Sequence, residues 1–269
     1  MAERVSASAR LKTWPQHLLP QHGLTRLANA ASNSRWLARP LIRSFGRLYP
    51  VQLDECEPPA GGFDCFDAFF TRRLKPDVRT YPDNPSALAS PCDGTVSQIG
   101  AVEHGRIIQA KNRWFSVAEL LGGPERAEHF RAGRFATIYL APHDYHRVHM
   151  PLAGRLVAEA RIPGRLFSVS ASTSRAIDRL YARNERLVAI FDTEYGPTAV
   201  VMVAALLVAG ISTAWDPDDH PRPGKTIRTR TFDPPPALAR GEELGRFHWG
   251  STVIVLTGKN APAWNPAID

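Results

Sequence analysis

Two kinds of hydrophobic pattern divide the chain. In residues 1–50 the apolar positions recur three or four residues apart, whereas from about residue 87 onward they fall into short runs, many of them β-branched, between turn residues. The first pattern is typical of amphipathic helices and the second of strands. We therefore predict an α+β fold, with a helical segment over residues 1–50 and a β-rich core within residues 51–269.

The predicted helical segment carries a regular stripe of arginines. They stand at every fourth position, at Arg35, Arg39, Arg43 and Arg47, with aromatic and aliphatic residues between them. On a helix this spacing sets a basic stripe beside an apolar one. Such a helix either lies in a membrane surface or packs on the protein core, and the pattern leaves both open. Pro40 predicts that the segment is divided into two short helices.

Residues 198–215 form an uncharged stretch that is only just long enough for a membrane-spanning helix. The stretch lacks flanking Lys or Arg, and Gly196 and Pro197 precede it. We therefore expect one or two fully buried strands rather than a membrane span.

A second apolar run, residues 253–256, follows Gly250 and Ser251 directly and predicts a buried strand close to the end of the sequence. A Gly-Ser pair before a strand is most simply a tight turn, in which glycine supplies backbone freedom and serine a local hydrogen bond. The pattern alone gives this pair no further role.

Three histidines, His143, His146 and His149, follow a predicted strand that ends before Pro142. Such a cluster suggests a metal site, but the sequence has no HExxH motif and no Cys or carboxylate at an obvious ligand spacing. In an extended chain, moreover, His146 and His149 point to opposite faces. We predict no metal, and one or two of these histidines as proton-transfer residues near neutral pH.

Charge and cysteine content narrow the function. The 269 residues carry a formal charge of +7, which favours an anionic partner. The chain lacks a zinc finger and a strongly basic DNA-reading helix, so we do not expect it to bind nucleic acid. Its three cysteines contain no CxxC pair, which fits a reducing compartment.

Several strings, taken together and in order, resemble one family, the bacterial phosphatidylserine decarboxylase proenzymes, which are pyruvoyl-dependent and cut themselves. The strings are FDAFFTRRL at 66–74, PCDGTVSQ at 91–98, YLAPHDYHRVHMP at 139–151, PGRLFSV at 163–169, ARNER at 182–186, FDTEYGP at 191–197 and GEELGRFHWGST at 241–252. One position departs from the family pattern, because Trp249 stands where Leu usually precedes Gly-Ser-Thr. This departure bears on the packing around the site rather than on the reaction.

The resemblance implies that the hydroxyl of Ser251 attacks the carbonyl of Gly250. Cleavage between these residues gives a β chain of residues 1–250 and an α chain of residues 251–269, and leaves a covalent pyruvoyl group in place of Ser251. This cofactor forms a Schiff base with phosphatidylserine, which is decarboxylated to phosphatidylethanolamine. The family also implies that the two chains remain associated as a heterodimer, and a dimer of these is a further expectation.

The resemblance also implies roles for individual residues. His149 is the base and Asp93 its orienting partner, in a charge relay with Ser251. Asp93 and Gly94 together also form a turn signal. His146 is a candidate proton donor in decarboxylation, with a structural role left open, and His143 and His248 are expected to be structural or to lie at the rim.

The implied substrate is phosphatidylserine in an anionic membrane. It favours residues 1–50 as a membrane-associating segment and places the protein peripherally on the cytoplasmic face of the cell membrane. Two other functions remain open: a soluble pyruvoyl-dependent amino-acid decarboxylase, and a non-enzymatic carrier-like β module. The latter is less favoured because no lysine stands at a predicted hairpin tip near residues 91–96. An uncleaved, inactive relative is a further alternative.

Overall fold

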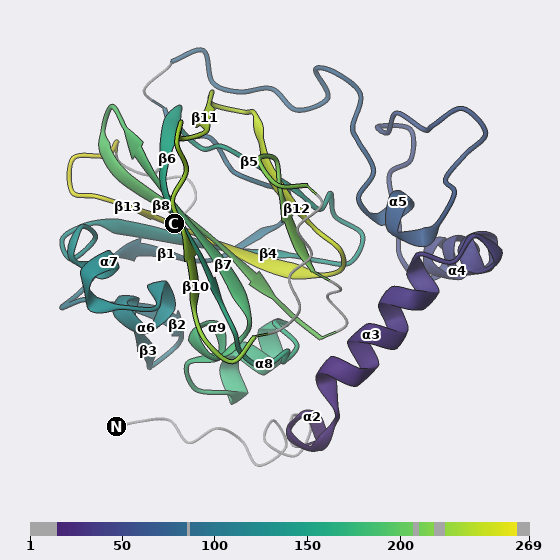
Figure 1. The fold of residues 1–269 in the computed structure, drawn as a ribbon, viewed down its shortest axis with the longest axis horizontal. Coiled ribbons are helices and arrows are strands. Elements are labelled where there is room, and N and C mark those ends of the chain that lie inside the picture. The colour runs from purple at the N-terminus through teal and green to yellow at the C-terminus, as the bar shows by residue number, and fades with distance from the viewer. Residues whose placement is uncertain (1–14, 85–86, 207–209, 218–223, 263–269) are drawn as a thin grey trace.

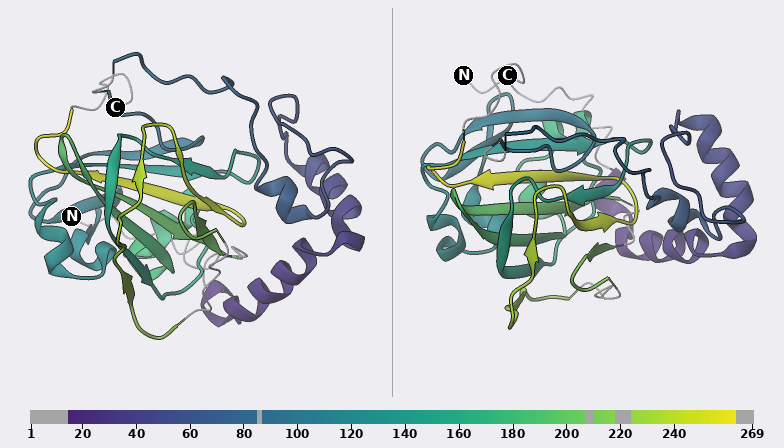
Figure 2. Two further views of the ribbon diagram at one scale, coloured as in Figure 1. Left: turned by 45° about the horizontal axis from the view of Figure 1, so that its top comes forward. Right: turned by 90° about the horizontal axis from the view of Figure 1, so that it is seen from above.

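The computed structural model describes residues 15–84, 87–206, 210–217 and 224–262 (Figure 1). A large antiparallel sheet forms the core, and the N-terminal helices lie to one side of it (Figures 1 and 2). The predicted α+β class, with a β-rich core and N-terminal helices, is confirmed. The ends of the predicted helical segment (residues 1–14) and of the predicted α chain (residues 263–269) lie outside the described residues.

The main sheet is antiparallel at every pairing, and its strands lie in the order β1-β4-β13-β8-β7-β6-β10, with β11 also paired to β6. The bounds of these strands are β1 (Thr95–Ala101), β4 (Arg134–Leu140), β6 (Gly154–Ile162), β7 (Arg186–Thr193), β8 (Gly196–Ala204), β10 (Arg228–Arg230), β11 (Ala237–Leu238) and β13 (Ser251–Thr257). A sheet of this kind satisfies its backbone groups internally, so its interior strands can be apolar on both faces.

β13 is such an interior strand, and all 7 of its residues are buried. Its first residue, Ser251, lies opposite Leu140 of β4 on one side and Ala204 of β8 on the other. The buried strand predicted over residues 253–256 is therefore confirmed. The apolar run lacks alternation because both faces of the strand are covered.

The uncharged stretch at residues 198–215 also forms strands. It supplies most of β8 and the whole of β9 (Ile211–Thr213), and its described strand residues are buried. The prediction of buried strands is confirmed. Within the described ranges, no helix is both long and apolar enough to cross a membrane.

Two smaller sheets accompany the main one. In the first, β12 (Glu243–Phe247) pairs with both β9 and β5 (Arg147–His149), and in the second β2 (Arg106–Ala110) pairs with β3 (Arg113–Ser116). Short helices lie beside the sheets, namely α6 (Val117–Leu121), α7 (Pro124–Glu128), α8 (Ala171–Ala176) and α9 (Leu180–Arg183). The first small sheet matters for function, since β5 carries His149 and β12 leads to Ser251.

The N-terminal helices form an arm along one side of the molecule (Figures 1 and 2). They are α2 (Pro15–Leu18), α3 (Gln21–Ser32) and α4 (Arg35–Leu48). The base of the arm is tied to the core, because the side-chain oxygens of Gln16 and Gln21 accept hydrogen bonds from the amides of Ser168 and Leu166, at 2.9 and 3.0 Å.

α4 runs through Pro40 without interruption, so the predicted division into two helices is wrong. Proline removes one backbone hydrogen bond, here the one to the carbonyl of Trp36. Trp36 is 94% exposed, so water can take the place of the missing donor. The loss is therefore tolerated at this surface position.

A group of rings joins the arm to the core. We call Phe45 of α4 together with Phe66, Phe69 and Phe70 of α5 (Phe66–Phe70) the aromatic cluster, and all four side chains are buried. Phe45 meets Phe66 edge-on, with ring centres 5.2 Å apart, and the ring of Trp249 packs against the same cluster. The arm is thus linked, through α5, to Trp249, which lies two positions before Ser251.

Candidate active site

The start of β13 gathers buried polar atoms that lack partners. Within the described part of the chain, the hydroxyl of Ser251, Nε2 of His146 and the indole nitrogen of Trp249 are buried without a hydrogen bond. Most buried polar atoms in folded proteins are paired, so a group of unpaired ones marks a site where chemistry or a ligand is to be accommodated. Ser251 itself is 0% exposed.

Asp93 and His149 share a cavity of about 410 Å³. The other residues that line it include Arg79, Tyr81, Cys92, Tyr145 and Gly241. Asp93 lies just before β1, and His149 ends β5. The structure therefore brings these two predicted residues to one cavity, while Ser251 lies at the buried start of β13.

His149 is held by groups that orient its ring. Its Nδ1 lies 2.8 Å from the carbonyl oxygen of Gly241, and its Nε2 lies 3.1 Å from the hydroxyl of Tyr145. A carbonyl can only accept, so Nδ1 carries the proton and Nε2 is left as the acceptor, which is the tautomer a general base needs. Burial lowers the pKa of His149 below its ordinary value and keeps the ring neutral.

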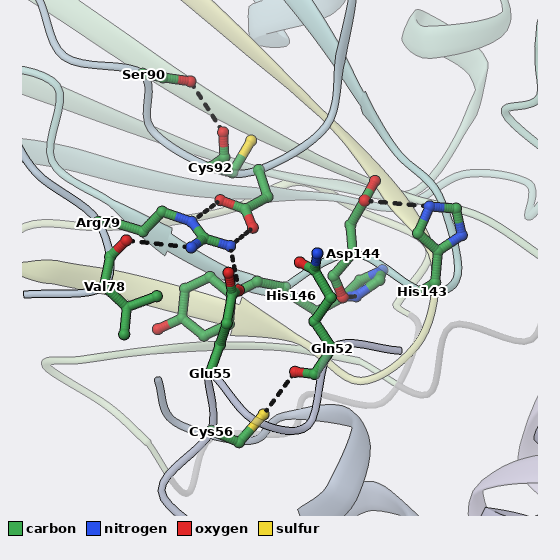
Figure 3. A network of polar contacts seen from close by, with 12 residues as sticks. Gln52, Glu55, Cys56, Val78, Arg79, Ser90, Cys92, His143, Asp144 and His146 are labelled. Atoms are coloured by element: carbon green, nitrogen blue, oxygen red, sulfur yellow. Dashed lines mark hydrogen bonds and ion pairs between the residues drawn. The ribbon is translucent and has the colours of Figure 1, made fainter. Parts of the chain in front are cut away.

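Asp93 is bound to a cation. Arg79 donates to both of its carboxylate oxygens, at 2.9 and 2.7 Å, and also to Glu55 at 2.8 Å. Figure 3 shows the Arg79 guanidinium between Glu55 and the segment that carries Cys92. Asp93, and then Glu55, raise the pKa of Arg79 well above its ordinary value. The side chain of Asp93 bonds Arg79, and that of His149 bonds Gly241 and Tyr145, so the charge relay between them stays a prediction.

His146 is separate from His149, as their spacing predicts. It is 0% exposed, its Nδ1 lies 2.8 Å from the carbonyl oxygen of Asp144, and its ring centre is 4.1 Å from that of Phe70. Burial lowers its pKa to about 3. His143 is partly exposed, and its Nε2 lies 3.5 Å from the Asp144 carboxylate (Figure 3).

His248 ties the segment before Ser251 to its surroundings. Its Nδ1 contacts both carboxylate oxygens of Asp67 in α5, at 2.9 and 3.0 Å, and its Nε2 lies 3.0 Å from the Ser212 hydroxyl. These contacts agree with the structural role expected for His248.

The backbone is strained at Trp249, where φ is 122°. Such a conformation costs a residue other than glycine roughly 1–3 kcal/mol. The indole stacks on Phe66 and Phe70, with ring centres 4.8 and 5.6 Å apart, and each aromatic pair contributes about 0.5–1.5 kcal/mol. These contacts are large enough to offset the strain.

Gly250 was expected to supply backbone freedom in a tight turn, but its conformation does not require glycine. An added Cβ at Gly250 would meet no atom within 4 Å, and its φ lies outside the left-handed region. Strain in this turn resides at Trp249, the position at which the chain departs from the family pattern.

Three groups of the site were not predicted from the sequence: Arg79, Tyr145 and the carbonyl of Gly241. Tyr145 and Gly241 lie within the strings that resemble the family, and this position could have indicated that they belong to the site. Arg79 lies in a segment without helix or strand periodicity, and a contact of this kind is set by the tertiary fold.

An antiparallel β-rich core beside a cavity lined by Asp93, His149 and Tyr145 defines an α+β protein with an enzyme-like site. A family model described as phosphatidylserine decarboxylase matches residues 66–268, and a second, described as PSD, matches residues 11–50. The chain belongs to the phosphatidylserine decarboxylase family.

Relatives match over nearly the whole chain. A protein of Methylococcus capsulatus named phosphatidylserine decarboxylase proenzyme is 49% identical over 259 residues, which cover 94% of this chain and 90% of that protein. One of the same name from Azotobacter vinelandii is 47% identical over 268 residues, covering 96% and 93%. Another, from Pseudomonas putida, is 48% identical over 264 residues, covering 95% and 92%.

Proposed function

We propose that this chain is the precursor of a phosphatidylserine decarboxylase. It cuts itself between Gly250 and Ser251 into a β chain of residues 1–250 and an α chain of residues 251–269, and the product converts phosphatidylserine to phosphatidylethanolamine. The observation that carries the proposal is the buried, unpaired hydroxyl of Ser251 at the first position of a central strand. The proenzyme names of the relatives support it.

Self-cleavage begins with an attack by Ser251 Oγ on the Gly250 carbonyl. Nε2 of His149 takes the hydroxyl proton, and the Ser251 nitrogen leaves as an amine, so that an ester replaces the amide. Removal of the Ser251 α-proton then expels the Gly250 carboxylate and forms a carbon–carbon double bond. Addition of water releases ammonia and leaves a ketone at position 251. In this scheme Asp93 acts on His149 through its negative charge.

The resulting pyruvoyl group supplies a carbonyl that binds the substrate amine and accepts the electron pair left when carbon dioxide departs. The unpaired atoms around position 251 fit a group that needs donors and acceptors nearby. Nε2 of His146 is an acceptor in the tautomer set by Asp144. It is therefore able to contact the bound substrate, and His146 is our candidate proton donor in decarboxylation.

The two products stay together because the α chain begins as β13. This strand has hydrogen-bonded neighbours on both sides, and its residues are buried. Ladder hydrogen bonds and side-chain burial hold it without the covalent link. A heterodimer of the two chains is therefore part of the proposal.

We further propose that the arm docks the protein on the cytoplasmic face of the cell membrane as a peripheral protein. Large apolar side chains on the arm are exposed, among them Trp36 at 94%, Leu48 at 75% and Leu27 at 70%. The four arginines of α4 are exposed as well. Apolar side chains can enter the acyl region while the arginines meet anionic headgroups, as a bilayer-bound substrate requires.

Intact-protein mass spectrometry tests the proposal. We expect two chains, with the smaller beginning at position 251 and carrying a ketone in place of its amine. Ser251→Ala and His149→Ala should each remain one chain. The cleaved protein should decarboxylate phosphatidylserine in vesicles and leave free serine unchanged. A wild-type chain that stays uncut after prolonged incubation would refute self-cleavage, and turnover of free serine alone would favour an amino-acid decarboxylase.

A further inference from the structure

The segment just before the proposed cleavage point is held by one short helix. α5 provides Asp67, which contacts Nδ1 of His248, and also Phe66 and Phe70, on which the indole of Trp249 stacks. The consecutive residues His248 and Trp249 are therefore both fixed by this single short helix. α5 is itself packed in the aromatic cluster against Phe45.

The other side of the cleavage point is fixed as well. Ser251 is the first residue of β13 and has strand partners on both sides, Leu140 and Ala204. Only Gly250 lies between the two fixed points, and an added Cβ there would meet no atom within 4 Å. Since Gly250 has no side chain, the residues on its two sides are the fixed points nearest to its carbonyl.

Trp249 has a strained backbone directly before Gly250. Its φ of 122° turns the chain into a conformation that side-chain-bearing residues rarely adopt. Strain of this kind persists only where surrounding contacts over-determine it, and it clusters at functional sites. The stacking on Phe66 and Phe70, at interplanar angles of 28° and 23°, supplies those contacts.

We propose that Trp249 is a positioning residue for self-cleavage: its indole, stacked on Phe66 and Phe70, holds the backbone in the strained turn that presents the Gly250 carbonyl to Ser251. This inference rests on the proposed function and adds to it a residue that acts before the first bond is broken. In this proposal the function of Trp249 is to hold the turn against α5.

The rate of self-cleavage in variants at position 249 tests this role. We expect Trp249→Ala, which keeps a Cβ but loses the ring, to cleave at least tenfold more slowly than wild type. Trp249→Gly should also be slow, because relief of the strain leaves the turn without a fixed direction. Trp249→Phe keeps the stacking and should cleave within about threefold of wild type. A Trp249→Ala chain that cleaves at the wild-type rate would overturn the proposal.

Two controls separate positioning from loss of the fold. Phe69→Leu removes a ring of the aromatic cluster that contacts Phe45 and Phe66, whereas Trp249 stacks on Phe66 and Phe70. It should cleave like wild type. All variants are compared below their unfolding temperatures, measured on the uncut chains. A Trp249→Ala chain that cleaves slowly only where it is partly unfolded would point to a structural role instead.

Hydroxylamine, which cuts esters and leaves amides intact, locates the affected step. If Trp249 positions the attack, Trp249→Ala forms little ester and stays uncut in hydroxylamine at times when wild type is cleaved. Cutting of Trp249→Ala by hydroxylamine as fast as wild type would place its defect after the attack and overturn the assignment. Failure of the proposed function is distinguishable, because the wild-type chain itself would then remain uncut.

Discussion

Arg79 holds both carboxylate oxygens of Asp93, donating from Nε at 2.9 Å and from Nη2 at 2.7 Å. The Nδ1 of His149, which a charge relay would join to Asp93, instead contacts the carbonyl of Gly241. Burial is the largest influence on the pKa of His149 and lowers it, and the charge of Asp93 acts in the opposite direction. The tautomer of His149 is thus set by the backbone, and Asp93 contributes charge.

This arrangement predicts a moderate effect for Asp93→Asn. The variant keeps the shape of the side chain and removes its charge, while Gly241 continues to fix the tautomer. We expect self-cleavage to slow roughly 10-fold to 100-fold, far less than the ~10⁴-fold loss seen when a relay carboxylate itself sets the tautomer. Time courses of chain conversion on denaturing gels measure the rate. Glu55→Gln, which leaves the Arg79–Asp93 pair in place, is the matched control and should behave as wild type.

Self-cleavage should tolerate mildly acidic pH. The base must be neutral, and burial lowers the pKa of His149 from 6.5, so the neutral ring persists below that pH. We expect a constant rate from pH 8 down to 6.5 and a fall only at lower pH. In Asp93→Asn the fall should move to still lower pH, because a charge that favours the protonated ring is gone. A wild-type midpoint above 6.5 would contradict the burial argument.

His146 should make the fold less stable in acid. The folded protein binds a proton there only near pH 3, since burial lowers the pKa to about 3, whereas the unfolded chain binds one near 6.5. The unfolded state therefore holds more protons between these values, and stability falls as the pH falls, by up to about 1.4 kcal/mol per unit. Urea unfolding of uncut Ser251→Ala, with and without His146→Gln, isolates this contribution. A difference that does not change between pH 7 and pH 4.5 would show that His146 is already charged or accessible.

Membrane docking should depend on exposed side chains of the arm. Replacing Trp36 and Leu48 together by Ser removes two large apolar groups that are 94% and 75% exposed, without opening the core. Flotation with vesicles of phosphatidylserine and phosphatidylcholine should show at least tenfold weaker binding, and self-cleavage should be unchanged. Val157→Ser, at a 54% exposed position of β6, is the control and should float like wild type. Equal flotation of all three proteins would rule out docking through the arm.

Much of the fold was predictable because the patterns are physical consequences of burial. The run at residues 253–256 predicted a strand covered on both faces, and β13 is such a strand. The prediction at Pro40 failed because a proline costs little where water replaces the lost donor, and sequence does not show which face of a helix meets solvent.

The site was predictable in its residues more than in its contacts. His149 and Asp93 do line one cavity, but the partner of Asp93 is Arg79, from a segment whose position depends on the whole fold. The group that orients His149 is the backbone carbonyl of Gly241. A motif of residue types does not show which backbone atom a side chain will contact. The strain at Trp249 likewise could not be predicted, because it lies in the backbone angle φ, which the sequence does not show.

The position of β13 has a consequence for the timing of the reaction. Among the described residues it is the last strand, yet it lies between β4 and β8. A ribosome delivers the N-terminal parts of a chain first, so this central place is filled only after β4 and β8 have been made. Ser251 meets Leu140 and Ala204 at that moment and not before. In the proposed self-cleavage, the chain therefore carries an ordinary serine during synthesis, and the reactive ketone arises only after β13 has taken its place.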